Sequence, residues 1–142
     1  MFNFGAACNA DGSPVKVILA EDVPEIRIYF DRVISRRLHV NVEVAVDGRE
    51  LREKLEKEKL EKEKFDIIIS DIMMPYESGD SVLESVDVGD TPIVILSAIP
   101  PGDIVKIAER LVSSGRNIIA AETKPVTMKR IKGIIREFCE RS

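Results

Sequence analysis

Acidic, hydroxyl and basic side chains follow the apolar runs of this 142-residue sequence. Glu21 and Asp22 follow VKVILA, Asp71 follows FDIIIS, Ser97 follows TPIVIL, and Lys124 lies just beyond NIIAA. If these runs are parallel strands of one open sheet, their carboxyl ends share a crevice, which is where such sheets bind ligands. We therefore expect three carboxylates, one hydroxyl and one ammonium group at the same edge of the sheet.

This set of side chains indicates a particular chemistry. Clustered carboxylates raise one another's pKa unless a cation lies among them, and oxygen ligands of this kind suit Mg²⁺. A carboxylate can also attack phosphorus as a nucleophile and form an acyl phosphate. A metal ion and a lysine then stabilise the charge on the transferring group. The sequence thus indicates Mg²⁺-dependent phosphoryl transfer to a carboxylate.

Each of these residues, taken singly, also has a structural explanation. Glu21 and Asp22 suit the N-terminal cap of a following helix, and Asp71 suits a turn. Ser97 suits a buried hydroxyl bonded to backbone, and Lys124 suits an ordinary surface lysine. Their joint occurrence at the ends of successive apolar runs is harder to explain by coincidence and favours a site.

The elements that must position these side chains are five strands alternating with helices. The predicted strands are Val15–Ala20, Asn41–Val46, Phe65–Ser70, Thr91–Leu96 and Asn117–Ala121. Helical spacing of apolar residues follows Pro24 and returns between Met128 and Phe138. Because parallel strands need crossover connections, this alternation predicts an α/β fold with a parallel sheet.

A Glu/Lys-rich tract follows the second predicted strand. A helix is expected to begin near Arg49 and to run through Lys64, with Glu placed four residues before Lys at several positions. Leu51 and Leu55 share one face, but the apolar spacing ends after Leu55. We therefore expect the end of this helix to project past the core into solvent.

Length and composition bound the class of protein. A chain of 142 residues with 44% apolar and 32% charged residues is typical of a single globular domain, here residues 14–142 after a flexible leader at 1–13. The net charge of −4 offers no basic field for nucleic acid. The sequence shows no secretory signal and no apolar run long enough for a membrane span. We expect Cys8 and Cys139 to be free thiols. These features together predict a cytoplasmic location.

Five runs together resemble the receiver domain of response regulators, the CheY-like superfamily. They are VILAEDVPEIRIYFDRVI, EVAVDGREL, FDIIISDIMMP, PIVILSA and TKP, and the resemblance covers about residues 15–140. It implies a flavodoxin-like, doubly wound, five-stranded parallel sheet in the order 2-1-3-4-5, with helices on both faces.

The resemblance also implies a role for each site residue. Asp71 is similar to the phospho-acceptor, and Glu21, Asp22, Asp71 and the backbone carbonyl of Met73 to the Mg²⁺ ligands. Ser97 and Lys124 are then the hydroxyl and the lysine that take part in catalysis and switching. The Lys124-Pro125 bond is one at which the family often has a cis peptide.

Some positions depart from the family pattern. Ala121 stands where the family usually has an aromatic switch residue, so the usual coupling of phosphorylation to output is in question. The segment between Ser97 and Lys124 is longer than typical, and Ser78 to Asp90 is short. Met74-Pro75 and Gly79 agree with the loop after the acceptor. We expect the surface around the fourth helix to be reshaped.

The function that follows is a stand-alone receiver in two-component phosphorelay signalling. A sensor histidine kinase or a phosphotransfer protein would phosphorylate Asp71, and the altered surface would bind a downstream protein rather than nucleic acid or a membrane. The chain would catalyse only its own phosphorylation and dephosphorylation. The alternative is a pseudo-receiver, an interaction module that works without phosphorylation, which Ala121 mildly supports.

Two further alternatives are weaker. An aspartyl-phosphate hydrolase of the haloacid dehalogenase type has its nucleophile after the first strand in a D-x-D motif, whereas Glu21-Asp22-Val23 stands there. His39, the single histidine, lies at the end of the first helical pattern. A cap at a helix C-terminus explains it better than a phosphoryl carrier does.

Overall fold

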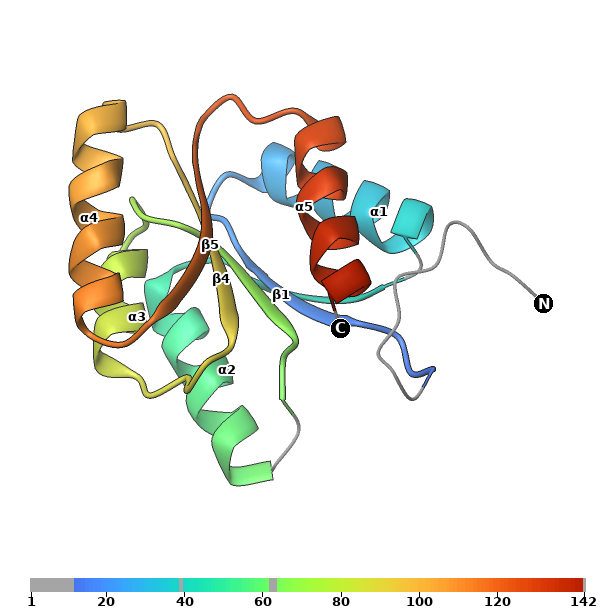
Figure 1. The fold of residues 1–142 in the computed structure, drawn as a ribbon, viewed down its shortest axis with the longest axis horizontal. Coiled ribbons are helices and arrows are strands. Elements are labelled where there is room, and N and C mark those ends of the chain that lie inside the picture. The colour runs from blue at the N-terminus through green and yellow to red at the C-terminus, as the bar shows by residue number, and fades with distance from the viewer. Residues whose placement is uncertain (1–11, 39, 62–63, 142) are drawn as a thin grey trace.

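The part of the chain that the structure describes forms a five-stranded sheet flanked by five helices (Figure 1). The structure, a computed structural model, describes residues 12–38, 40–61 and 64–141. Along the chain the elements are β1 (Lys16–Ala20), α1 (Pro24–Leu38), β2 (Asn41–Ala45), α2 (Gly48–Glu61), β3 (Ile67–Asp71), α3 (Gly79–Ser85), β4 (Pro92–Ser97), α4 (Pro101–Ser113), β5 (Asn117–Thr123) and α5 (Met128–Arg141). Among the described residues, no helix is both long and apolar enough to cross a membrane.

All strands of the sheet run parallel, in the order β2-β1-β3-β4-β5. This confirms the predicted flavodoxin-like α/β fold. The chain moves outward from β1 to β2 and then returns past β1 to β3, so the connections after β1 and β3 leave in opposite directions. Such a reversal opens a crevice at the carboxyl ends of the two strands.

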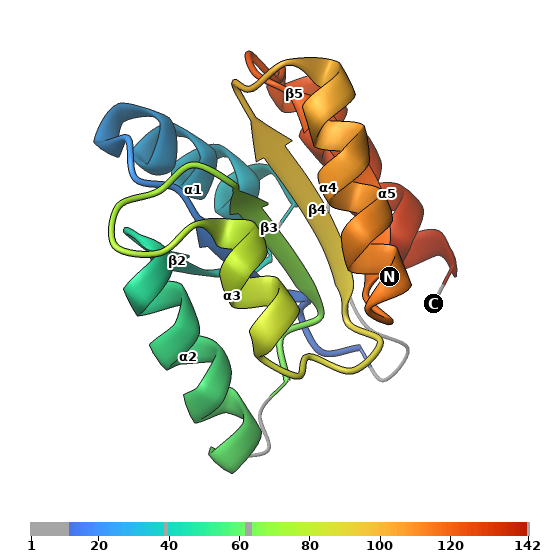
Figure 2. The same cartoon turned by 90° about the vertical axis from the view of Figure 1, so that its left-hand side faces the viewer.

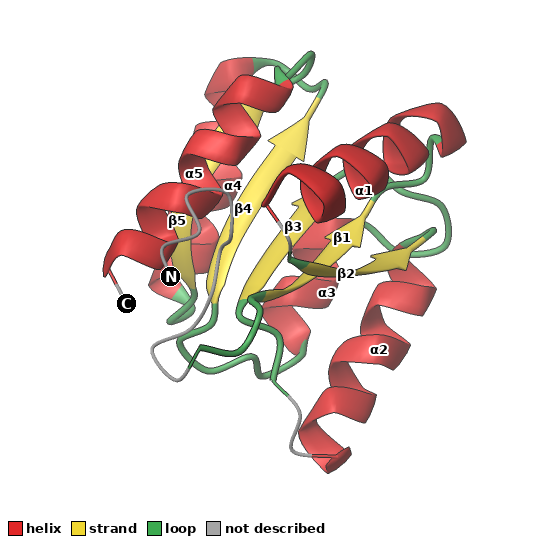
Figure 3. Cartoon of the chain, turned by 90° about the vertical axis from the view of Figure 1, so that its right-hand side faces the viewer, coloured by secondary structure: helices red, strands yellow, loops and turns green. Residues whose placement is uncertain are grey.

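Helices cover both faces of the sheet. Helices α1 and α5 lie on one face (Figure 3), and α2, α3 and α4 lie on the other (Figure 2). Because side chains alternate along a strand, each buried strand supplies both cores. In β1, Val17 and Leu19 pack toward α1 and α5, whereas Ile18 and Ala20 pack toward the other helices. Two apolar layers therefore hold the strand ends in fixed positions.

Strands β3, β4 and β5 extend further at their carboxyl ends, into polar residues, than the apolar runs of the sequence predicted. Asp71 is the last residue of β3, Ser97 is the last of β4, and β5 continues to Thr123 rather than ending at Ala121. The physical reason is that the backbone ladder continues after the apolar side chains end. Ile72 N–H donates to the Leu96 carbonyl at 3.2 Å, and Lys124 N–H donates to the Ser97 carbonyl at 2.8 Å.

The predicted helix through Lys64 is too long. Helix α2 ends at Glu61, and Lys64 lies outside it. The Glu58 carboxylate accepts a hydrogen bond from Phe65 N–H at 2.6 Å, which joins the last turns of the helix to the chain entering β3. The expected projection is confirmed, because Leu55 is buried whereas Leu60 is 85% exposed.

Some sequence predictions fall on residues that the structure does not describe. The leader predicted at residues 1–13 lies almost entirely within residues 1–11, and Cys8 is among them. His39 and the side chain of Cys139 are also outside the described part. The structure does not test these predictions.

Candidate functional site

The acidic pair lies directly after β1. Glu21 is buried, with 1% of its surface exposed, because its N–H continues the β1–β2 ladder by donating to the Ala45 carbonyl at 3.0 Å. Its carboxylate accepts a hydrogen bond from Val23 N–H at 3.3 Å. Asp22 is half-buried beside it. The local turn thus directs two neighbouring carboxylates toward the crevice.

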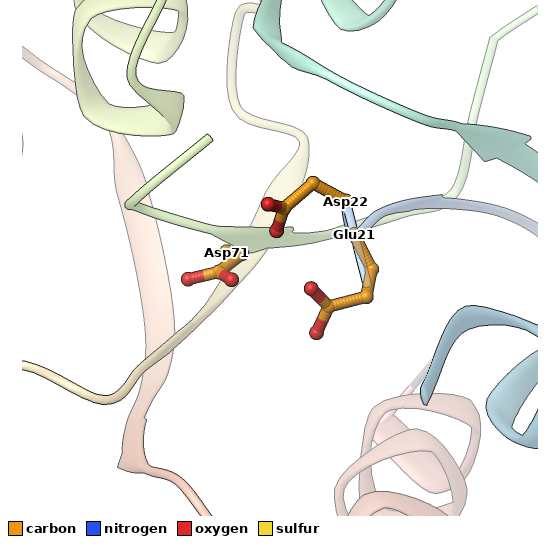
Figure 4. A group of neighbouring side chains, drawn as sticks. All are labelled: Glu21, Asp22 and Asp71. Atoms are coloured by element: carbon orange, nitrogen blue, oxygen red, sulfur yellow. The ribbon is translucent and has the colours of Figure 1, made fainter. Parts of the chain in front are cut away.

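Asp71, at the end of β3, brings a third carboxylate to this place. Its side chain is buried, and Oδ1 accepts a hydrogen bond from Met73 N–H at 3.3 Å. One carboxylate oxygen from each of Glu21, Asp22 and Asp71 lies within 4.8 Å of the other two (Figure 4). The structure therefore gathers the three acidic residues that the sequence singled out, and it places the Met73 backbone next to Asp71.

Lys124 links two of these carboxylates. Its ammonium nitrogen lies 2.7 Å from Asp71 Oδ2 and also donates to Glu21 Oε1. Burial lowers the pKa of Lys124, but hydrogen bonds and charge from Asp71 and Glu21 outweigh it and raise that pKa above its usual value. The peptide bond between Lys124 and Pro125 is cis, as the resemblance implied.

The charges at the site do not balance. Burial raises the pKa of the Glu21 carboxyl, against the opposing hydrogen bond from Lys124, and the charge of Asp71 raises it further. Three carboxylates gather around one ammonium group, so the formal charges of these side chains sum to two negative charges. A divalent cation with oxygen ligands fits this donor set. Glu21, Asp22, Asp71 and the Met73 carbonyl are the groups that would hold Mg²⁺.

Ser97 stands at the end of the neighbouring strand. Its side chain is fully buried, and its hydroxyl accepts a long hydrogen bond of 3.3 Å from Ile99 N–H. Asp71 pairs in register with Leu96, the residue before Ser97. The two residues therefore sit on adjacent strands at the same edge, and the hydroxyl hydrogen is not used in the Ile99 contact.

Gly79 permits the loop after β3 to fold back over the acceptor. Its N–H donates to the Ile72 carbonyl at 2.7 Å, and a Cβ atom here would lie 2.0 Å from the Asp71 carbonyl oxygen. No residue with a side chain fits so close to the strand end. The sequence marked Gly79 through the family pattern, and the close approach gives the physical reason for that glycine.

The sequence patterns did not single out two basic residues near the site. Arg27 of α1 donates a hydrogen bond to the Glu21 carbonyl at 3.1 Å. Arg52 of α2 makes two hydrogen bonds to Glu77, in the loop between β3 and α3. Spacing along one helix shows that a basic residue is present, but it does not show which loop lies opposite.

The segments that the sequence marked as unusual in length, Ser78 to Asp90 and Ser97 to Lys124, contain α3 and α4. Helix α3 has 7 residues and α4 has 13. Ala121 is exposed on β5 and pairs in register with Ile95. A bulge displaces the β4–β5 register, since Ile93 pairs with Ile118 whereas Val94 pairs with Ala120.

Known proteins show which family shares this arrangement. Residues 17–136 match the family described as the response regulator receiver domain. The transcriptional regulatory protein TrcR of Mycobacterium tuberculosis is 31% identical over 138 residues, covering 94% of this chain and 48% of that protein. The osmosensing histidine protein kinase SLN1 of Saccharomyces cerevisiae is 29% identical over 128 residues, covering 88% of this chain and 10% of that protein. The chain thus spans about half the length of the first relative and much less of the second.

A solved structure agrees with the sequence match. The receiver domain of the Francisella response regulator 1452 has a TM-score of 0.70 and 25% identity, and the comparison covers 89% of this chain and 97% of that one. Since the family match extends over most of the sequence, the chain belongs to the response regulator receiver domain family.

Proposed function

We propose that this receiver domain accepts a phosphoryl group on Asp71 in a Mg²⁺-dependent reaction and thereby switches a protein-binding surface. The observation that carries the proposal is the joint contact of Lys124 with Asp71 and Glu21 inside a cluster of three carboxylates. Other basic side chains of this protein also contact two carboxylates, but at Lys124 the side chains of Glu21 and Asp71 are only 1% and 7% exposed, so water screens their charges poorly. An excess of negative charge at so buried a place suits a divalent cation, which would in turn attract a phosphoryl group.

The proposed step is a displacement at phosphorus. A carboxylate oxygen of Asp71 forms the new O–P bond, while the P–N bond of a phosphohistidine breaks and the released imidazole nitrogen takes up a proton from solvent. Bound Mg²⁺ would offset the negative charge that develops on the phosphoryl oxygens. Lys124 supplies a second positive charge beside the acceptor and orients its carboxylate.

Ser97 is proposed to be the group that reports on phosphorylation. Its hydroxyl is buried at the adjacent strand end and makes one long contact, to Ile99 N–H. A phosphoryl group on Asp71 adds strong acceptor oxygens, toward which this hydroxyl would turn. The β4–α4 loop that carries Ile99 would then move with it, which changes the surface near α4.

The phosphoryl donor is proposed to dock beside α1. Receiver domains interact with histidine kinases or phosphotransfer proteins, and this chain has an apolar groove next to the site. The groove is lined by Ile26, Tyr29 and Phe30 of α1 and by Pro125 and Val126 after Lys124. Tyr29 is 55% exposed, which leaves apolar surface for a partner to cover.

The test is the mass of the intact protein after incubation with acetyl phosphate, with and without Mg²⁺. We expect a gain of one phosphoryl group that needs Mg²⁺ and is lost in Asp71→Asn. The matched control is Asp66→Asn, which changes the carboxylate just before β3, at the end of the strand away from the site, and should keep the gain. A protein that gains no mass under any of these conditions would support the pseudo-receiver alternative.

Other finer expectations stay predictions from the sequence. They are the stand-alone arrangement, the cytoplasmic location, a downstream protein target in place of nucleic acid, and the absence of turnover beyond the protein's own phosphorylation cycle. Release of more than one equivalent of phosphate from an added phosphate ester would contradict the last of these.

A further inference from the structure

The loop between β3 and α3 contains a strained turn. Glu77 N–H donates to the Pro75 carbonyl at 2.8 Å, which closes a γ-turn around Tyr76. Tyr76 has a φ of 70°, in the left-handed region that side-chain-bearing residues rarely occupy. Strain of this kind persists only where the surroundings hold the chain firmly, and it concentrates near functional sites.

Helix α2 supplies what holds this turn. Arg52 donates from Nε to Glu77 Oε1 at 2.8 Å and from a second nitrogen to Oε2, so the pair is bidentate. The same guanidinium donates to the Ser85 hydroxyl of α3. Arg49, one turn earlier, lies over the Tyr76 ring at 4.1 Å from its centroid. We call Arg52 and Glu77 together the loop clamp.

Backbone contacts bring the loop still closer to α2. Gly48 N–H approaches the Pro75 carbonyl at 3.4 Å, and a Cβ at Gly48 would lie 1.8 Å from the Glu77 carbonyl oxygen. The first turn of α2 and the loop therefore touch without intervening side chains.

The loop clamp is connected to the acceptor by a short piece of chain. Met73 N–H donates to Asp71 Oδ1, and Gly79 N–H donates to the Ile72 carbonyl, so both ends of the loop are fixed at the site. Between these fixed ends the loop contacts α2 through Pro75, Tyr76 and Glu77. Three residues separate Met73 from Glu77, so the position of Glu77 limits the positions open to the Met73 backbone.

We propose that Arg52 is a positioning residue for the phosphoryl-acceptor site, which acts by holding Glu77 and, through the β3–α3 loop, the Met73 backbone beside Asp71. The inference rests on the proposed function. An isolated ion pair on the surface has little effect. Here two hydrogen bonds join the guanidinium to the carboxylate and the side chains are only 30% and 26% exposed, so the pair is better oriented and less screened than an isolated surface pair.

The experiment is a double-mutant cycle with Arg52→Ala, Glu77→Ala and the double variant. Binding of Mn²⁺ is followed by electron paramagnetic resonance, and the initial rate of phosphorylation by acetyl phosphate is followed by intact mass. We expect each single change to weaken Mn²⁺ binding and slow phosphorylation about three- to tenfold, below the 10–100-fold typical of groups bonded directly to a ligand. The double variant should lose no more than either single one, because both changes break one clamp.

Controls separate positioning from general damage. Lys57→Ala removes an exposed α2 lysine that lies 3.8 Å from Glu61, away from the loop, and should leave both readouts unchanged. Arg52→Lys keeps the positive charge but loses the two parallel guanidinium donors, so we expect a smaller loss of Mn²⁺ binding and of phosphorylation rate than in Arg52→Ala. Amide hydrogen exchange at residues 72–79 should accelerate in Arg52→Ala relative to the central strands.

The outcomes distinguish the two proposals. Normal Mn²⁺ binding and a normal rate in Arg52→Ala, or effects that multiply in the double variant, would overturn the positioning role while leaving phosphorylation of Asp71 intact. If the unmodified protein gains no phosphoryl group but Arg52→Ala still weakens Mn²⁺ binding, the proposed function fails and the positioning of the metal site stands.

Discussion

Lys124 Nζ lies 2.7 Å from Asp71 Oδ2 although 53 positions separate the two residues in the sequence. The sheet order explains this contact. Strands β3, β4 and β5 are neighbours, and Lys124 N–H donates to the Ser97 carbonyl at the end of β4. That backbone hydrogen bond fixes where the lysine side chain starts, and the side chain then reaches across β4 to the acceptor.

Replacing Lys124 by alanine should destabilise the protein by about 1–3 kcal/mol in EDTA, because two buried carboxylates lose a charged hydrogen-bond donor. Mg²⁺ should recover much of this loss, since the cation takes over part of the charge. The measurement is urea denaturation with and without Mg²⁺. Lys57→Ala, a change at an exposed lysine, is the control. An equal loss in both buffers would contradict a cation site beside Lys124.

Mg²⁺ should raise the melting temperature of the unmodified protein, and EDTA should reverse the effect. A ligand that binds only the folded state stabilises it by about 2.7 kcal/mol at a concentration one hundred times its Kd. Thermal unfolding followed by circular dichroism measures the shift. Asp22→Asn should reduce the shift strongly. Asp90→Asn, which changes an exposed carboxylate between α3 and β4, should preserve it. A shift of the same size in both variants would place the cation elsewhere.

Two glycine-to-alanine changes should act in opposite directions. Gly79→Ala places a Cβ 2.0 Å from the Asp71 carbonyl oxygen and should destabilise by about 1–3 kcal/mol, the usual range for overpacking. Gly102→Ala, in the first turn of α4, meets nothing within 4 Å and should stabilise by up to about 1 kcal/mol through helix propensity. Chemical denaturation of both variants checks the signs. A neutral Gly79→Ala would mean that the loop can move away from the strand end freely.

The stability of the protein should carry a pH dependence from Glu58. Burial raises the pKa of this carboxyl above its usual value of 4.5, although the hydrogen bond from Phe65 N–H opposes the shift. The folded state therefore holds the proton more tightly than the unfolded state. This contribution favours folding below pH 4.5 and is lost as the pH rises through the raised value.

Glu58→Gln should remove that dependence, because glutamine keeps an acceptor for Phe65 N–H but does not ionise. The free energy of unfolding of Glu58→Gln relative to the unmodified protein should therefore increase between pH 4 and pH 7, measured by urea denaturation at each pH. Glu53→Gln changes an exposed residue of the same helix and serves as the control. A difference that stays constant across this range would show that Glu58 does not titrate differently on folding.

Strand positions and the acidic pair were accessible from the sequence because both depend on local patterns. Runs such as FDIIIS are buried on both faces, and a parallel sheet follows from their alternation with helical patterns. The positions of Asp71 and Ser97 followed from the rule that strand ends share one edge. The strand boundaries were placed less well, because the backbone ladder continues into polar residues such as Asp71 and Thr123.

The sequence by itself determined the fold class, the family and the set of residues that meet at the sheet edge. Only the tertiary structure decided the pairing of Arg52 with Glu77, the left-handed turn at Tyr76 and the reach of Lys124 to two carboxylates at once. The physical reason is one of range. Strands and helices involve many residues, so their apolar spacing repeats along the sequence and can be recognised there. The loop clamp depends instead on one distance between two side chains. That distance is set by the packing of α2 against the loop, and no spacing along the chain encodes it.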